Sequence, residues 1–133
     1  MGAEDNIKTV QTLYEAFGRG DVQTIIENVT DDVDWGAEAS STDAPWYRPR
    51  SGKDGVEEFF QNFGSSVEVR EFTPTAFGSN DTDVFAIVRF RGVSRATGKE
   101  TAMDLHHWFR FRDDKVFYYR GSEDTAQSVA SLS

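Results

Sequence analysis

Hydrophobic residues recur at helical spacing in the first half of the chain. Three segments each carry one apolar stripe with a period near 3.6, which predicts helices over residues 4–18, 21–29 and 52–63. The stretch GRGD ends the first of them. Ser51, followed three residues later by Asp54, resembles a capping box at the start of the third. Each predicted helix therefore has one face to bury against another layer.

The second half alternates between apolar and polar residues, which is the pattern of strands that bury one face. It predicts one short strand and four long ones, over residues 31–35, 66–78, 83–95, 99–112 and 115–123. The separators GSNDTD, RATGKE and RDDK are typical of turns, and the polar segment 37–50 with its two prolines indicates a loop. Helices followed by a run of antiparallel strands predict an α+β fold with a strongly curved sheet and a conical cavity between the layers.

Composition limits the classes of protein that this chain can be. A length of 133 residues predicts one domain over 1–133, and 38% hydrophobic residues allow a real core. A net charge of −9 argues against nucleic-acid binding, because phosphate backbones need a basic surface. The absence of cysteine excludes disulfides, thiol nucleophiles and cysteine-bound zinc. Without a signal-peptide pattern or a long apolar run, we expect a cytoplasmic protein that makes no membrane contact.

Alternation divides the last three long strands into an apolar face and a charged face. The predicted inward set, which would line the cavity, is Val84, Ala86, Val88, Phe90, Met103, Leu105, His107, Phe109, Phe111, Phe117, Tyr119, Gly121 and Glu123. The predicted outward set, suited to an outer or dimer-forming face, is Arg89, Arg91, Asp104, His106, Trp108, Arg110 and Arg112. The only two histidines of the chain, His106 and His107, therefore face opposite ways.

His107 and Glu123 are the two titratable residues predicted inside this otherwise apolar cavity, and we treat them as candidate catalytic residues. An imidazole can pass a proton near neutral pH, and a carboxylate in apolar surroundings is a plausible acid or base. If Glu123 reaches His107, it fixes the imidazole tautomer. Each residue also has a plainer interpretation. His107 would be a core histidine bonded to a buried hydroxyl or carbonyl, and Glu123 a solvated residue near a strand end.

Apolar and aromatic residues are candidates for the substrate-binding wall of the cavity, with core packing as the alternative. They are Tyr14, Trp35, Trp46, Tyr47, Val88, Phe90, Phe109 and Tyr119. Arg48 and Arg50 are either solvated loop charges or groups that close the cavity mouth on an anionic ligand. Two histidines on opposite faces of a strand make an awkward metal site, so we expect neither a metal nor a cofactor.

The order of elements and several short stretches resemble one superfamily. The stretches are LYEAFGRGDVQTI (13–25), TDDVDW (30–35), YRPRSGKDGVEEFF (47–60), HHWFRFRDDKV (106–116) and SEDTAQSVA (122–130). Together they resemble the nuclear-transport-factor-2-like superfamily and, more narrowly, its SnoaL-like and ketosteroid-isomerase-related proteins. The resemblance implies a cone-shaped α+β barrel, a homodimer formed through the outer sheet face, and one deep apolar pocket. Members include isomerases, polyketide cyclases, epoxide hydrolases, dehydratases and non-catalytic binding domains, so the fold alone does not choose the chemistry.

The catalytic residues of ketosteroid isomerase are not kept in this chain. That enzyme uses a carboxylate base with a tyrosine and a protonated aspartate as its oxyanion hole. In a hand alignment its oxyanion aspartate falls on His107, and its tyrosine falls on Leu13, one step from Tyr14. Its base falls on Ala37, one step before Glu38. The limonene-epoxide-hydrolase pattern of Asp-Arg-Asp is not evident either, so both steroid isomerisation and epoxide opening are disfavoured.

Two functions of different classes are consistent with these patterns. The first is a cofactor-independent isomerase, cyclase or lyase that transfers a proton on an apolar small molecule, with His107 and Glu123 as catalytic residues. The second is a module that binds an apolar small ligand without converting it. A structural dimer with a cavity filled by side chains is a third possibility, and a structure distinguishes it from the other two.

Overall fold

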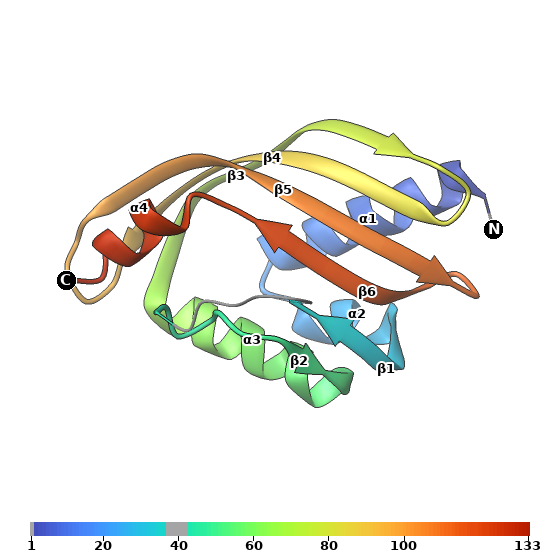
Figure 1. Ribbon diagram of the computed structural model, residues 1–133, viewed down its shortest axis with the longest axis horizontal. Coiled ribbons are helices and arrows are strands. Elements are labelled where there is room, and N and C mark those ends of the chain that lie inside the picture. Colours follow the sequence, from blue (N-terminus) through green and yellow to red (C-terminus); the bar gives the residue numbers. More distant parts are fainter. Residues whose placement is uncertain (1, 37–42) are drawn as a thin grey trace.

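The computed structural model describes residues 2–36 and 43–133 and has an α+β architecture, which confirms the predicted fold class (Figure 1). Its elements follow in the order α1 (Ala3–Gly18), α2 (Val22–Glu27), β1 (Val29–Trp35), β2 (Arg50–Ser51), α3 (Gly52–Ser66), β3 (Val67–Ser79), β4 (Asp83–Ser94), β5 (Glu100–Arg112), β6 (Lys115–Ser122) and α4 (Thr125–Ala130). The four long strands and three of the helices lie close to the predicted segments.

The strands form one six-stranded sheet in the order β2-β1-β6-β5-β4-β3. All neighbours run antiparallel except β1 and β6, which are parallel. The sheet arches over α1, α2 and α3, as Figure 1 shows, and it does not close into a complete barrel. Helix α1 contacts β3 and β4 while α3 contacts β1, so the apolar stripes of these helices meet the concave face of the sheet.

Three local features differ from the sequence expectation. The short strand β2 and the terminal helix α4 were not predicted, although Asp124 caps α4 by accepting a hydrogen bond from the backbone N–H of Gln127 at 3.1 Å. The predicted capping box at Ser51 is wrong, because its side chain makes no cap hydrogen bond. Ser51 instead ends β2, where it pairs with Asp34, and Gly52 turns the chain into α3 with a φ of 76°.

The predicted division of β4 and β5 into two faces is confirmed. On β4, Val84 and Val88 are fully buried, whereas Phe85 and Ile87 between them are exposed. The same alternation on β6 fails at Phe117, which was predicted to face inward. The register between β5 and β6 shifts where Val116 and Tyr118 oppose consecutive residues of β5. This bulge leaves Phe117 on the outer face, where it lies under the guanidinium groups of the two outward arginines of β5.

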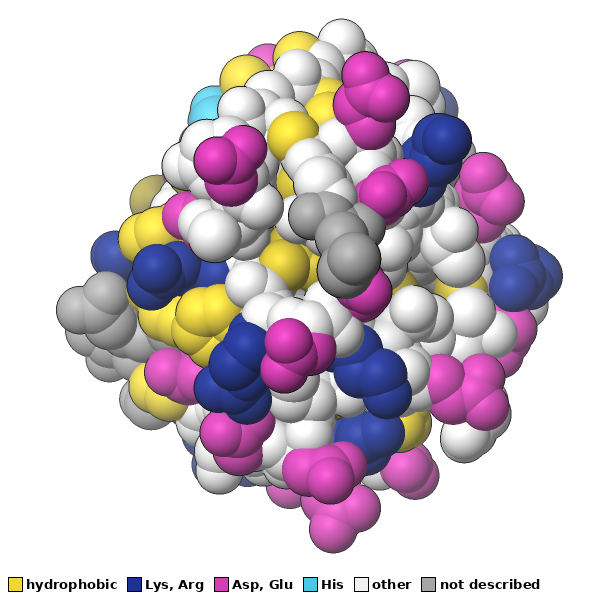
Figure 2. Space-filling model, turned by 90° about the vertical axis from the view of Figure 1, so that its right-hand side faces the viewer, with side chains coloured by type: hydrophobic (Ala, Val, Ile, Leu, Met, Phe, Trp, Pro, Cys, Tyr) yellow, Lys and Arg dark blue, Asp and Glu magenta, His cyan; other side chains and the backbone are white. Residues whose placement is uncertain are grey.

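The charged side chains of the molecule are dispersed over its surface. Figure 2 shows one face, on which acidic groups lie between basic ones instead of leaving a continuous basic area. Ion pairs on the outer sheet face, such as Arg110 with Asp83 at 3.4 Å and Arg89 with Asp104 at 3.7 Å, follow the same mixed pattern. The excess negative charge of the chain is therefore spread over a surface of mixed sign.

Candidate functional site

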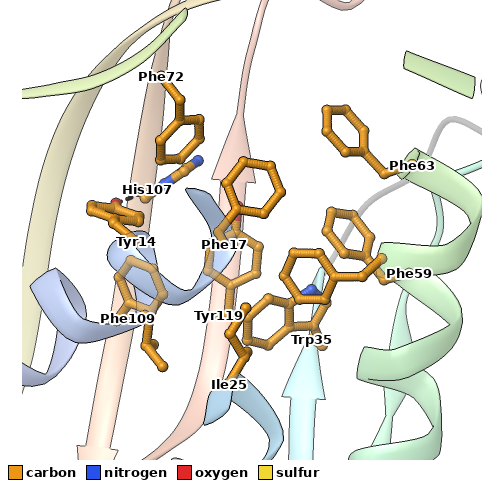
Figure 3. Close-up of a pocket in the computed structure, with 12 residues that line it drawn as sticks. Tyr14, Phe17, Ile25, Trp35, Phe59, Phe63, Phe72, His107, Phe109 and Tyr119 are labelled. Atoms are coloured by element: carbon orange, nitrogen blue, oxygen red, sulfur yellow. Dashed lines mark hydrogen bonds between the residues drawn. The ribbon is translucent and has the colours of Figure 1, made fainter. Parts of the chain in front are cut away.

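A cavity of about 80 Å³ lies between the helices and the concave face of the sheet (Figure 3). Its lining residues are Leu13, Tyr14, Phe17, Ile25, Trp35, Phe59, Phe60, Phe63, Phe72, His107, Phe109 and Tyr119. The only polar side-chain atoms in this set are two tyrosine hydroxyls, one indole N–H and the imidazole nitrogens. Sites for drug-sized ligands usually measure roughly 300–1,000 Å³, so the cavity as it stands suits a small ligand or one part of a larger one.

Tyr14 and His107 form the central polar contact of the cavity. The hydroxyl oxygen of Tyr14 lies 2.7 Å from Nδ1 of His107 (Figure 3). Tyr14 belongs to the buried stripe of α1, and His107 lies on the inward face of β5, where it pairs with Ala86 on one side and Gly121 on the other. The bond is the hydroxyl contact expected of a core histidine, but the position of both rings on the cavity wall also makes them available to a ligand.

Burial keeps both partners of this hydrogen bond neutral. Desolvation lowers the pKa of His107 to about 3, and the nearby His106 acts in the same direction. Desolvation raises the pKa of Tyr14 well above its ordinary value, and the neighbouring Tyr119 adds to this shift. His107 is therefore an uncharged imidazole near pH 7, whereas a free imidazole would titrate there.

A neutral imidazole carries one N–H, so the pair has two hydrogen-bonding arrangements. In the first, the Tyr14 hydroxyl donates to Nδ1 and the N–H at Nε2 stays free. In the second, the N–H at Nδ1 donates to the Tyr14 oxygen, and the Tyr14 O–H stays free. Among the described residues no side chain hydrogen-bonds to Nε2. Either arrangement thus leaves one O–H or N–H donor for an acceptor atom inside an aromatic cavity.

Trp35 contributes a second unpaired donor to the same cavity. It ends β1, is 3% exposed and packs against Tyr119, with ring centroids 4.3 Å apart and the rings tilted by 30°. Its indole N–H has no hydrogen-bond partner among the residues that the structure describes. A buried polar group left unpaired costs about 1–3 kcal/mol, which makes this N–H a candidate contact for a ligand oxygen or a water molecule.

Glu123 does not hydrogen-bond to His107, so the expected orienting contact between them is absent. Its Oε2 accepts a hydrogen bond from the hydroxyl of Tyr47 at 2.8 Å and another from Ser128 at 2.5 Å. The reason is the unpredicted helix α4, which follows β6 and brings Ser128 back over the carboxylate. Burial raises the pKa of the Tyr47 hydroxyl, and the charge of Glu123 acts in the same direction, so this hydroxyl stays a donor.

The remaining predicted wall residues separate into three groups. Tyr14, Trp35, Phe109 and Tyr119 line the cavity with His107. Trp46, Phe90 and Glu123 line a second, smaller cavity of about 40 Å³, and Tyr47 bonds to Glu123. Val88 is fully buried in the core and is not among the residues that line either cavity. The positions aligned with the isomerase base, Ala37 and Glu38, lie outside the described residues.

Five phenylalanines of the cavity wall were not singled out as site residues. They are Phe17, Phe59, Phe60, Phe63 and Phe72. All but Phe72 lie on the apolar stripes of the predicted helices. These stripes face the strand that carries His107, and that arrangement is the signal that would have identified them as cavity residues. Arg50 also needs correction, because it is not a solvated loop charge. Its side chain is 4% exposed and donates hydrogen bonds to the backbone oxygen of Trp46 and to Glu58.

Metal-binding clusters and membrane-spanning helices are both absent from the part of the chain that the structure describes. Residues 2–36 and 43–133 contain no group of three or more histidine, aspartate or glutamate side chains placed to hold a metal ion. No helix within these ranges combines the length and the apolar character needed to cross a membrane.

The curved sheet, the helices beneath it and the cavity between them define an α+β cone-type fold. The model of the SnoaL-like domain matches residues 10–119, and the chain belongs to this family. This confirms the resemblance to the nuclear-transport-factor-2-like superfamily and its SnoaL-like branch. Among curated proteins no sequence match is found.

Solved structures of other proteins have the same fold. A nuclear-transport-factor-2-like (NTF2-like) protein from Burkholderia xenovorans superposes with a TM-score of 0.88 at 20% identity, over 100% of this chain and 99% of that one. TerC, co-crystallised with polyporic acid, gives 0.85 at 19% identity over 96% and 98%. A putative polyketide cyclase from Xanthomonas campestris gives 0.78 at 22% identity over the whole of both chains. At these identities the likeness concerns the fold alone.

Proposed function

We propose that the cavity binds a small apolar molecule through an acceptor oxygen such as a carbonyl, and that Tyr14 and His107 polarise this oxygen for a cofactor-independent isomerisation or cyclisation. The observation that carries the proposal is the 2.7 Å hydrogen bond between these residues in an otherwise aromatic cavity. In low-dielectric surroundings a fixed donor aimed at an oxygen that gains charge stabilises that charge strongly. The co-crystal of TerC with polyporic acid and the relative described as a putative polyketide cyclase support a small-molecule role.

A balanced proton transfer follows from the arrangement in which Nδ1–H donates to Tyr14. The free O–H of Tyr14 bonds to the carbonyl oxygen, and Nε2 of His107 accepts a proton from the adjacent carbon. The C–H electron pair becomes the C=C bond of an enolate whose charge is on the oxygen held by Tyr14. Returning the proton to another carbon completes an isomerisation. Attack of the enolate carbon on a second carbonyl of the substrate, whose oxygen takes the proton back from His107, completes a cyclisation. Because burial makes His107 a weak base, we expect proton abstraction to be the slow step.

One observation favours the second candidate function, binding without conversion. The described residues that line the cavity include no carboxylate, and the pKa of about 3 makes His107 a weak base. In this case the donor of the Tyr14–His107 pair and the indole N–H of Trp35 select a ligand by its oxygens, while the aromatic walls supply the affinity. Ligand retention without product formation is the signature of this candidate.

Exchange of the methyl protons of acetophenone in D2O separates the two candidates. If the pair forms an enolate, the native protein speeds the loss of the methyl proton signal by about 100-fold or more over buffer. Replacing His107 with leucine returns the rate to that of buffer, and Tyr14→Phe lowers it at least about 10-fold. His106→Leu, on the outer face, is the matched control and keeps the native rate. Saturable binding of acetophenone without exchange contradicts catalysis and assigns the protein to the binding candidate.

We further propose that the protein is cytoplasmic and that it forms a homodimer through the outer faces of β4 and β5. Phe85 and Ile87 are 44% and 37% exposed there, and the ring of Phe85 stacks on Trp108. An exposed apolar patch of this kind on a sheet is typical of a protein contact. Light scattering coupled to size exclusion is expected to give twice the chain mass for the native protein and for the control Gln61→Lys, and the single mass for Ile87→Lys. A native protein that elutes as a monomer contradicts the dimer.

A further inference from the structure

The second cavity, of about 40 Å³, adjoins the first. Phe63 and Phe72 line both cavities, so the two spaces are separated by little more than these rings. The walls of the second cavity include one carboxylate, Glu123, and the hydroxyls of Ser94 and Ser128 among its polar groups. The aromatic chamber with the Tyr14–His107 pair thus continues into a smaller chamber of different chemistry.

Ser94 is the clearest sign that this smaller chamber accommodates a ligand group. The residue is 3% exposed and ends β4 on its inward face. Its Oγ has no hydrogen-bond partner among the described residues, although buried hydroxyls are nearly always paired. Glu123 also has capacity left, because a carboxylate offers about four acceptor positions and the structure assigns two donors to Oε2. A ligand hydroxyl in this chamber would donate to Glu123, whereas Ser94 lies at the far end of the chamber, because Gly92 pairs with Thr101 and Ser94 follows two residues beyond.

The pairing of β5 with β6 shows how far apart His107 and Glu123 lie along the sheet. His107 pairs with Gly121 and His106 pairs with Ser122, so Glu123 follows at the level of Leu105. Two strand residues separate that level from His107, which corresponds to about 7 Å along the inward face. Leu105 also lines the smaller chamber, so the apolar surface between the two ends is continuous.

We propose that the two chambers are the two ends of one elongated site. Its ligand has an apolar body, an acceptor oxygen bound by Tyr14 and His107, and a hydroxyl bound by Glu123, with the rings of Phe63 and Phe72 turning aside for the body. The acceptor end of this assignment rests on the proposed function, whereas the hydroxyl end rests on the second chamber alone. A volume of about 40 Å³ fits this role, because a group the size of one water molecule occupies about 30 Å³.

Four ligands of one shape test both ends separately. Ethylbenzene has neither polar group, acetophenone has the carbonyl, 4-ethylphenol has the hydroxyl, and 4-hydroxyacetophenone has both. Dissociation constants are measured by NMR titration of the full chain. The hydroxyl is expected to lower the dissociation constant about 10-fold, both from ethylbenzene to 4-ethylphenol and from acetophenone to 4-hydroxyacetophenone. One buried hydrogen bond to a charged group is worth about that factor.

Variants of residues in the second chamber test whether the hydroxyl's gain in affinity arises there. Ser94→Ala removes an unpaired hydroxyl and should fold as stably as the native chain, and Glu123→Gln removes the charge. Glu123→Gln is expected to cut the hydroxyl's gain to less than about 3-fold while acetophenone binds as before, whereas Ser94→Ala keeps the gain. Ser79→Ala and Glu15→Gln, both exposed, are the matched controls and keep the full gain.

The outcomes for the two proposals are distinct. Equal affinity for ethylbenzene and 4-ethylphenol, or a hydroxyl gain that persists in Glu123→Gln, overturns the elongated site and leaves the second chamber as a water site only. Equal affinity for ethylbenzene and acetophenone overturns the carbonyl end, and with it the proposed function, without affecting the hydroxyl comparison.

Discussion

Replacing Arg50 with alanine is expected to lower the free energy of unfolding by about 2–4 kcal/mol. The guanidinium group donates to the backbone oxygen of Trp46 at 2.9 Å and to Oε1 of Glu58 at 3.0 Å, and it lies 5.8 Å from the centre of the Phe59 ring. Removing it leaves the carbonyl of Trp46 buried without its charged donor and opens a gap beside α3. No other side chain ties the segment before β2 to this helix through as many bonds in the described ranges.

Arg48→Ala is the matched control for this experiment. Arg48 lies two positions earlier and contacts the same oxygen of Glu58, but its side chain is 55% exposed and the distance is 3.3 Å. Exposed ion pairs of this kind contribute about 0–1 kcal/mol. Urea unfolding of both variants gives the comparison, and the fluorescence of Trp46 reports whether the segment stays docked. If the urea midpoint of Arg50→Ala lay as close to the native midpoint as that of Arg48→Ala does, Arg50 would not hold the segment in place.

The role of Arg50 shows where sequence patterns stop being informative. A polar loop with prolines gives no sign that one of its two arginines will be buried, because burial depends on α3 presenting Glu58 and on backbone oxygens that have no sequence signature. The contact between Tyr14 and His107 joins residues 93 positions apart. Alternation and helical spacing each assigned one of these residues to an inward face, but only the crossing of α1 over the sheet brings them together.

The regular parts of the fold were the predictable parts. Alternation gave the correct faces on β4 and β5, whose pairing runs without a register shift. It failed at Phe117, where a bulge inserts one residue, and a bulge depends on packing that a period of two does not encode. Glu123 was predicted to share the cavity with His107, but it lines the second cavity, and its partners were missed because they lie on the unpredicted α4 and in the loop before β2.

Lowering the pH from 7 to 5 is expected to cost the native protein about 2 kcal/mol of unfolding free energy through His107 alone. Burial lowers its pKa in the folded state to about 3, from 6.5 in the unfolded chain. Between about pH 3 and 6.5 the unfolded state therefore binds one more proton than the folded state. The contribution of His107 to the free energy of unfolding is complete above about pH 6.5 and falls as the pH decreases towards 3. Carboxylates with lowered pKa values, such as Asp21 and Asp32, contribute their losses below about pH 4, outside the chosen range.

His107→Gln removes the titration and keeps an amide that can bond to Tyr14. Its unfolding free energy, measured by urea denaturation at pH 7, 6 and 5, is expected to stay level where that of the native chain declines. His106→Gln is the matched control on the outer face and should decline as the native chain does. If the unfolding free energies of His107→Gln and of the native protein changed in the same way with pH, the cavity would contain enough water for the imidazole to be charged in the folded state. In that case His107 would be a stronger base near neutral pH than its burial implies, and the slow step proposed for proton abstraction would need revision.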